Sequence, residues 1–373
     1  MSSSGTPFRG LGVILLVTAV LLSACGGAAT PTPAEAPEAT TASAEPLIVA
    51  FAHVGPVSDE GWTWSHDQGR LAVEAAFPNV ETMTIESMPF SEDATRALEG
   101  LVAAGANMVF VTSGYADYLY EVARAHPDVA FFECGAPGPE DLTNLVGYAI
   151  DSHNVAYLLG MTAGLLTESN KLGYVGAYPG IYGDVNAFEL GALSVNPEAI
   201  SEVVFVNSWF DPAAESQAAN ALIDDGVDVL YGIMDDPTYL TVAEERGVWA
   251  VMWNTDMRRY GPNAYVSSVL LNWNDFYVSE VQAYLDGSWT GGRFVSLPLG
   301  EGVDRDAWGQ NVPADVQTQV EAVREQILGG WSPFVGPISD AGGTVRVESG
   351  VAMAWSDIVL AWDWPIEGIR VRE

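Results

Sequence analysis

Aromatic and carboxylate side chains occur together in a short stretch of the sequence. The stretch GPVSDEGWTWSHDQGR covers residues 55–70 and lies between an apolar run and a helix-like pattern. Asp59 is placed to cap the helix, and Trp62 falls in its first turn. A ring and a carboxylate at the start of a helix are suited to binding a flat polar molecule.

Four further segments place similar residues directly after an apolar run. They are TSGYADY, NSWFDPAAE, MDDP and WNTDM. In open parallel sheets, ligands bind beyond the carboxyl ends of the strands, so we expect these five strand exits to form one pocket. The expected ligand-binding residues are Asp59, Trp62, Ser113, Gly114, Trp209, Asp235, Asn254 and Asp256.

Some of these polar residues also have a simpler structural explanation. Asp211, and one of Asp235 and Asp236, fit the N-cap position of a helix. The position of His66 on an apolar helix face favours a hydrogen-bonded packing role over catalysis. Trp209 is harder to explain in this way, because a large ring at a strand exit gains little from contact with solvent.

The elements that must position these residues follow an alternating pattern from Leu47 onward. Ten short apolar runs alternate with segments of helix length, which is typical of parallel sheets with crossover helices. Ten strands exceed what one compact open sheet usually holds. The pattern therefore predicts an α/β fold with two lobes, each a mainly parallel sheet flanked by helices. The expected strands cover 47–54, 81–88, 108–113, 129–135, 145–150, 171–178, 202–209, 229–234, 249–254 and 265–273.

The start of the chain predicts export and anchoring. Residues 1–24 have a basic start, an apolar core and small residues, as in a signal peptide, and the apolar core is too short for a membrane span. The core ends in LLSAC, which resembles the bacterial lipobox, so Cys25 is expected to be lipidated. An ordinary signal peptide with an incidental cysteine is the alternative. Residues 25–46, rich in Pro, Ala, Thr and Glu, predict an extended tether.

The folded part is expected to divide into two lobes and an extension. We predict a first lobe of residues 47–151 plus about 256–286, and a second lobe of residues 152–255 plus about 287–335. Residues 336–373 are predicted to form a C-terminal extension.

Composition and motifs exclude several functions. The formal net charge of −35 argues against nucleic acid as a partner, because phosphates require basic patches. The glycines of GYVGAYPG are a weak match to a dinucleotide fingerprint, and no nucleophile elbow is present. The four histidines are scattered without metal-ligand spacing. We therefore expect no enzyme activity, no catalytic residue, no cofactor and no metal.

Four segments carry a family resemblance. VGPVSDEGWTWSHDQGR, NAFELGALSVNPEA, VNSWFDPAAESQAANALIDDGVDV and SPFVGPISDAGGTVRV resemble the basic membrane protein family of ABC-transporter substrate-binding lipoproteins. The similarity runs from about Leu47 to near Ile369. It implies a type I periplasmic-binding fold, a purine nucleoside or related ligand, a permease in the membrane as partner, and an extracytoplasmic, lipid-anchored location. It implies no catalysis.

Two departures from that family bear on the ligand. Nucleoside-binding members that the chain resembles carry a ribose-binding aspartate where we align Asn254 and a lysine where we align Leu271. Because both charges are missing, we predict a free purine base such as adenine, stacked by Trp62 and Trp209. We expect Asp59 or Asp256 to accept from its N–H groups. The alternatives are a sensor lipoprotein that signals to a membrane partner, and a binder of another heteroaromatic such as a flavin.

Overall fold

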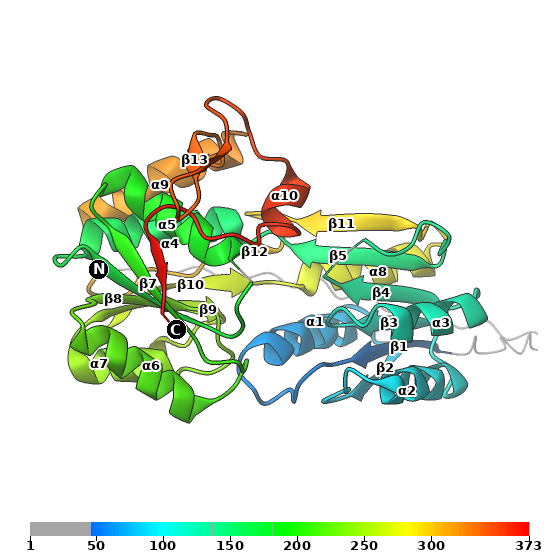
Figure 1. Cartoon of the computed structure of the whole chain (residues 1–373). Coiled ribbons are helices and arrows are strands. Elements are labelled where there is room, and N and C mark those ends of the chain that lie inside the picture. The colour runs from blue at the N-terminus through cyan, green and yellow to red at the C-terminus, as the bar shows by residue number, and fades with distance from the viewer. Residues whose placement is uncertain (1–45, 136, 181, 373) are drawn as a thin grey trace, which may run out of the picture. The chain divides into compact units, whose positions relative to one another are not determined.

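The computed structural model describes residues 46–135, 137–180 and 182–372 (Figure 1). The predicted signal peptide, Cys25 and all of the tether except Pro46 lie outside the described residues. The predicted fold class is confirmed, because the chain forms two α/β lobes with mainly parallel sheets. All ten expected strands are present, each ending within four residues of its expected bound.

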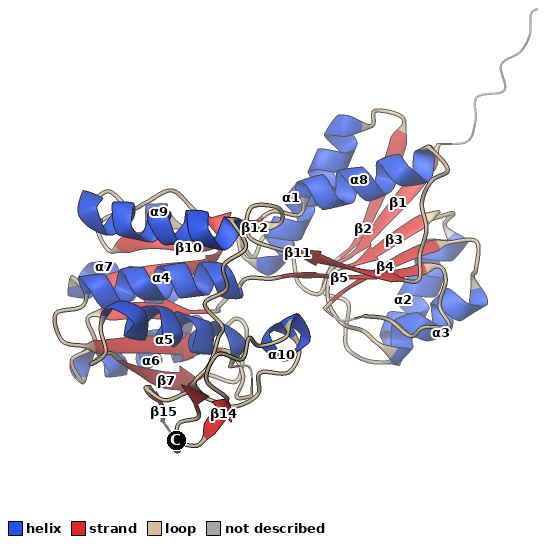
Figure 2. Ribbon diagram, turned by 90° about the horizontal axis from the view of Figure 1, so that it is seen from above, coloured by secondary structure: helices blue, strands red, loops and turns tan. Residues whose placement is uncertain are grey.

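The first lobe is built on a sheet of six parallel strands in the order β11-β5-β4-β3-β1-β2. Helices α1 and α8 cover one face, and α2 and α3 cover the other (Figure 2). The strands are β1 Leu47–Ala52, β2 Val80–Ile85, β3 Met108–Val111, β4 Ala130–Cys134, β5 Leu145–Ile150 and β11 Arg293–Leu297. The helices are α1 Trp62–Ala76, α2 Glu92–Ala103, α3 Asp117–Ala125 and α8 Asn274–Leu285.

The second lobe is built on a seven-stranded sheet in the order β12-β10-β9-β8-β6-β7-β15, in which only β12 is antiparallel to its neighbour. Helices α4, α5 and α9 lie on one face, and α6 and α7 on the other (Figure 1). The strands are β6 Lys171–Gly176, β7 Ile200–Phe205, β8 Val229–Gly232, β9 Trp249–Asn254, β10 Tyr265–Leu271, β12 Val303–Arg305 and β15 Ile369–Val371. The helices are α4 His153–Leu166, α5 Gly183–Val195, α6 Pro212–Asp224, α7 Thr238–Arg246 and α9 Ala314–Leu328.

The remaining elements follow β9 or belong to the C-terminal extension. The extension contributes the outer strand β15 to the second sheet, beside β7. These elements are η1 Arg258–Tyr260, the hairpin of β13 Ile338–Ser339 and β14 Val345–Val347, and α10 Trp355–Val359.

Two parts of the predicted lobe boundaries are wrong. The sequence predicts segment 256–286 in the first lobe, but its strand β10 pairs with β9 in the second sheet, and only α8 packs in the first lobe against α1. It predicts segment 287–335 in the second lobe, but the strand β11 of this segment pairs with β5 in the first. Apolar periodicity predicts a strand without indicating which sheet will pair with it.

The chain therefore crosses between the lobes more than once. It does so between β5 and α4, between β10 and α8, and between β11 and β12. The crossings are hydrogen-bonded to one another, since Asp151 N donates to Leu297 O at 3.0 Å and Asn272 N donates to Gly302 O at 2.8 Å.

Helices α4 and α5 approach each other closely enough that only glycine fits at the contact. A Cβ atom at Gly160 would overlap the carbonyl oxygen of Phe188, and one at Gly191 would overlap that of Tyr157. At Gly164 a Cβ atom would lie 2.7 Å from Ala192 O. Small residues on both helices thus allow backbone-to-backbone packing in the core of the second lobe.

This packing makes a prediction about stability. Gly160→Ala forces the two helices apart, and we expect it to lower the free energy of unfolding by about 2 kcal/mol or more. Gly100→Ala in α2 is the matched control, because a Cβ atom there meets nothing within 4 Å. The control should be neutral or stabilising by about 0.4–1 kcal/mol. Urea unfolding of both variants measures the difference, and equal effects would contradict the packing argument.

Candidate functional site

Asp59 fixes the start of α1, as predicted. Its Oδ1 accepts hydrogen bonds from Gly61 N at 2.9 Å and Trp64 N at 2.8 Å, and its Oδ2 accepts from Thr63 N at 2.9 Å. These donors would otherwise be unpaired at the helix N-terminus. Both carboxylate oxygens are engaged within the protein, and a direct bond from Asp59 to a ligand stays a prediction.

Trp62 is held in place by its polar edge and by neighbouring rings. Its indole Nε1 donates to Thr112 O at 2.8 Å, at the exit of β3. Its ring packs edge-on against His66 and Trp273, with centroid distances of 4.9 and 5.5 Å. The hydrogen bond joins the exits of β1 and β3. Its acceptor, Thr112, is followed directly by half-buried Ser113 and exposed Gly114.

A buried stack of rings from α8 supports Trp62. Trp273 stacks on His66 at 4.0 Å, and Tyr277 OH lies 2.5 Å from His66 Nδ1. Burial lowers the pKa of His66 well below its ordinary value, so this histidine is neutral and has a packing role, as predicted. The sequence reasoning missed Trp273 and Tyr277, although their spacing around Phe276 fits one face of a helix.

Asp235 is the point where strand exits of both lobes meet. Its Oδ1 accepts from Asn254 Nδ2 at 2.8 Å and, over a longer 3.4 Å, from Trp62 N in the first lobe. Its backbone N donates to Trp209 O at 3.0 Å. The structure therefore brings Asn254 and the start of α1 at Trp62 to the Asp235 carboxyl group, and joins Trp209 to Asp235 through the backbone alone.

Asn254 is buried and has a strained backbone. Its φ of 72° lies in the left-handed region, which asparagine tolerates better than most residues. The side-chain Nδ2 is used by Asp235, whereas Oδ1 is buried with no hydrogen-bond partner within the described residues. An unpaired buried amide oxygen is costly, which makes it a ready acceptor for a donor on a ligand.

Carboxyl groups gather around Asp235, and their burial changes their protonation. Burial, reinforced by the charge of Asp59, raises the pKa of Asp235 to about 7. Burial next to Asp236 raises the pKa of Glu215 to about 10, so Glu215 is protonated at neutral pH. Glu215 Oε1 accepts from Tyr239 N at 2.7 Å, and Asp236 Oδ1 accepts from Thr238 N at 2.9 Å. Asp236 is thus the residue that caps α7.

The other two predicted residues lie at the surface. Trp209 is 41% exposed and packs edge-on against Tyr178 at 5.9 Å. Asp256 is exposed, and its carboxylate binds Arg258 Nε at 2.8 and 2.9 Å instead of joining Asp235. A ligand contact by either residue stays a prediction.

Asp211 caps α6, since its Oδ1 accepts from Ala214 N at 3.0 Å, which confirms the predicted capping role.

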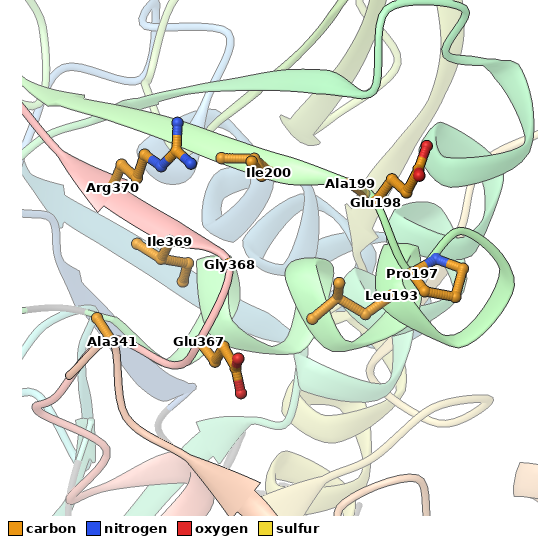
Figure 3. Close-up of a pocket in the computed structure, with 10 residues that line it drawn as sticks. All are labelled: Leu193, Pro197, Glu198, Ala199, Ile200, Ala341, Glu367, Gly368, Ile369 and Arg370. Atoms are coloured by element: carbon orange, nitrogen blue, oxygen red, sulfur yellow. The ribbon is translucent and has the colours of Figure 1, made fainter. Parts of the chain in front are cut away.

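A separate groove of about 500 Å³ lies at the opposite end of the second sheet (Figure 3). It is bounded by the end of α5, the start of β7 and β15. None of the predicted site residues lines it. Because ligands of open parallel sheets bind at the carboxyl ends of strands, this groove at the amino end of β7 is not the expected site.

Comparison with known proteins identifies the family. Residues 47–330 match the Bmp family, described as PnrA-like ABC transporter substrate-binding proteins. The chain belongs to this family. The Bmp family consists of solute-binding proteins and not of enzymes, and such proteins deliver a small-molecule ligand to a membrane permease. As a family of ABC importers it is extracytoplasmic.

Two relatives support the family assignment, and one solved structure shows the same fold. A Brucella abortus purine-binding protein is 35% identical over 311 residues, covering 82% of this chain and 88% of its own. A Haloferax volcanii protein with the provisional name ABC transporter glucose-binding protein is 37% identical over 292 residues, 76% of this chain and 73% of its own. An ABC transporter solute-binding protein structure from Conexibacter woesei aligns with a TM-score of 0.64 at 23% identity, covering 76% and 97% of the two chains.

Two further observations concern the described residues alone. No helix in these ranges has the length and apolarity that crossing a bilayer requires. The same ranges bring together no group of three or more His, Cys, Asp or Glu side chains able to hold a metal ion.

The raised pKa of Asp235 makes a prediction about stability. Because the folded-state pKa of about 7 exceeds the ordinary 3.8, the folded state binds its proton more tightly, and the free energy of unfolding should fall as pH rises from about 4 to 7. Asp235→Asn removes this contribution, on the order of 2 kcal/mol after allowing for partial exposure.

Urea unfolding at pH 5 and pH 8 measures the effect. The loss of stability between the two pH values should be smaller in Asp235→Asn than in the unmutated protein. Asp224→Asn is the control, because Asp224 pairs with Arg246 on the surface of the second lobe. An identical pH dependence in all three proteins would contradict the burial argument.

Proposed function

We propose that this Bmp-family protein is a lipid-anchored solute receptor that captures a purine base such as adenine for an ABC importer. The observation that carries the proposal is the pairing of Asp235 with Asn254 beside the fixed ring of Trp62. The carboxyl group and the free amide oxygen supply acceptors for ring and exocyclic N–H groups. The tryptophan supplies a surface on which a flat base stacks.

The absence of charge at two positions supports a base over its nucleoside. Asn254 offers a neutral amide where the resemblance implies a ribose-binding aspartate. Leu271 in β10 is 6% exposed and belongs to the apolar core, so it provides no charged group where the resemblance implies a lysine. A ribose would therefore find fewer charge-assisted hydrogen bonds here.

A sugar is the second candidate ligand, and the names of the relatives support each class. The Brucella abortus relative is named as purine-binding, and the Haloferax volcanii relative carries a glucose-binding name. Aromatic rings and carboxylates also suit sugars. A flavin, and a sensing role with a membrane partner other than a permease, are the remaining alternatives.

We further propose that the protein is held at the membrane by its N-terminus. Residues 1–24 would be removed, Cys25 lipidated, and residues 25–46 would form the tether to the folded part. The lipobox LLSAC supports this proposal. Lipidation would place the receptor beside its permease on the extracytoplasmic face.

The ligand proposal predicts a rank order of affinities. Adenine should bind with a Kd of about 1 μM, which is within the range for a ligand of about ten heavy atoms. Guanine, adenosine, inosine and glucose should bind at least about tenfold more weakly, since a tenfold difference needs only about 1.4 kcal/mol. Isothermal titration calorimetry of the purified protein measures all five, with riboflavin as a further arm. Adenosine or glucose binding tenfold more tightly than adenine would overturn the base proposal.

Substitutions test the stacking rings. Trp62→Ala should weaken adenine binding by about 1–3 kcal/mol, the usual loss of a stacking partner. Trp209→Ala should also weaken adenine binding, because this ring is proposed to form the second face of the sandwich. Trp64→Ala is the matched control in the same helix, because Trp64 is 38% exposed on another face. Unchanged affinity in Trp209→Ala would remove Trp209 from the site and leave the role of Trp62 intact.

The anchor proposal predicts a change of location. Cys25→Ser removes the lipid-bearing thiol and should release the protein from the membrane fraction, because the remaining chain has no acyl groups to retain it. Fractionation and immunoblotting of expressing cells measure this release. Retention at the unmutated level would show that the lipobox interpretation is wrong.

A further inference from the structure

Glu60 is a first-lobe residue whose hydrogen-bond partners lie in the second lobe. It lies in the loop between β1 and α1. Its backbone carbonyl accepts from Thr255 Oγ1 at 2.7 Å, and its carboxylate accepts from Tyr260 OH at 2.6 Å and pairs with Arg259. The three partners belong to the segment that follows β9 in the second sheet.

The backbone around Glu60 is shaped for this contact. Glu60 has a φ of 61°, in the left-handed region that a residue with a long side chain rarely occupies. At the next residue, Gly61, a Cβ atom would lie 2.9 Å from both Cα and O of Asp235. The turn thus packs closely against the second lobe. The surrounding contacts stabilise the strained backbone of Glu60 enough to offset its cost.

The contacts differ in strength. The Glu60 and Arg259 side chains are 39% and 59% exposed, so solvent screens their ion pair. Thr255 is 4% exposed, and its hydroxyl bond to the Glu60 carbonyl is shielded from water. The hydroxyl bond, assisted by Tyr260, should therefore contribute more than the ion pair.

We propose that Glu60, Thr255, Arg259 and Tyr260 form a closure latch that holds the lobes together and slows ligand release. The latch lies beside the bond from Trp62 N to Asp235, so separation of the lobes must break both sets of contacts. None of these four side chains is assigned to the ligand. Their effect on affinity is therefore exerted through lobe closure. The proposal rests on the proposed function, since it assumes a ligand held between the lobes.

Dissociation kinetics provide the first test. Thr255→Val removes the hydroxyl with little change in shape, and Glu60→Gln removes the charge with little change in length. In the full mature protein loaded with adenine, the double variant should release ligand about tenfold faster, as expected for loss of the Thr255 hydroxyl bond together with the Glu60 charge, with an association rate changed less than about threefold. Asp224→Asn, which breaks a surface ion pair within the second lobe, should leave both rates unchanged.

Small-angle scattering without ligand provides an independent test. The double variant should have a larger radius of gyration than the unmutated protein, because the open form gains population when the latch is removed. Adding adenine should restore compaction in both. If adenine does not bind, the proposed ligand fails while the scattering of the ligand-free proteins still tests the latch. Equal dissociation rates, or equal ligand-free radii where no adenine binds, would overturn the proposal.

Discussion

The hydrogen bonds of Asp235 connect the parts of the proposed site. Its carboxyl group accepts from Asn254 in the second lobe and from the start of α1 in the first, and its backbone N donates to Trp209 O. Each contact joins the exit of a different strand. A change at Asp235 would therefore alter contacts at the exits of β1, β7 and β9.

Burial and neighbouring carboxyl groups set the protonation state of Asp235. Burial raises the pKa of Asp235 to about 7 and that of Glu215 to about 10, which reduces the negative charge buried around Asp235. A hydrogen-bond donor on a ligand would favour the ionised form of Asp235. The protein therefore has a group poised near neutral pH where the two lobes meet.

Packing within the second lobe differs in kind from the contacts between the two lobes. Backbone contact at Gly160 and Gly191 locks α4 and α5 together within the second lobe, where close packing leaves little freedom. Between the lobes, the contacts include the hydrogen bonds around Glu60 and Asp235, the chain crossings and the packing of Trp355 against Phe294. Such contacts can be broken and re-formed without unfolding either lobe, which is what capture and release of a ligand require.

Local residue patterns are sufficient to predict most helices and strands, whereas the distribution of these elements between the two sheets depends on contacts between distant parts of the chain. Apolar runs and helix spacing predict the ten strands and the caps at Asp59 and Asp211, because these features depend on neighbours within a few residues. The number of strands predicts two lobes, and the apolar helix face around His66 predicts its packing role without indicating that Trp273 and Tyr277 are its partners. The sheet that β10 and β11 join, the stack of Trp273 behind Trp62, and the contacts of Glu60 with the segment after β9 were not predicted. Each depends on partners about 140 to 210 residues apart or on a choice between two similar sheet edges, and no local pattern records such a pairing.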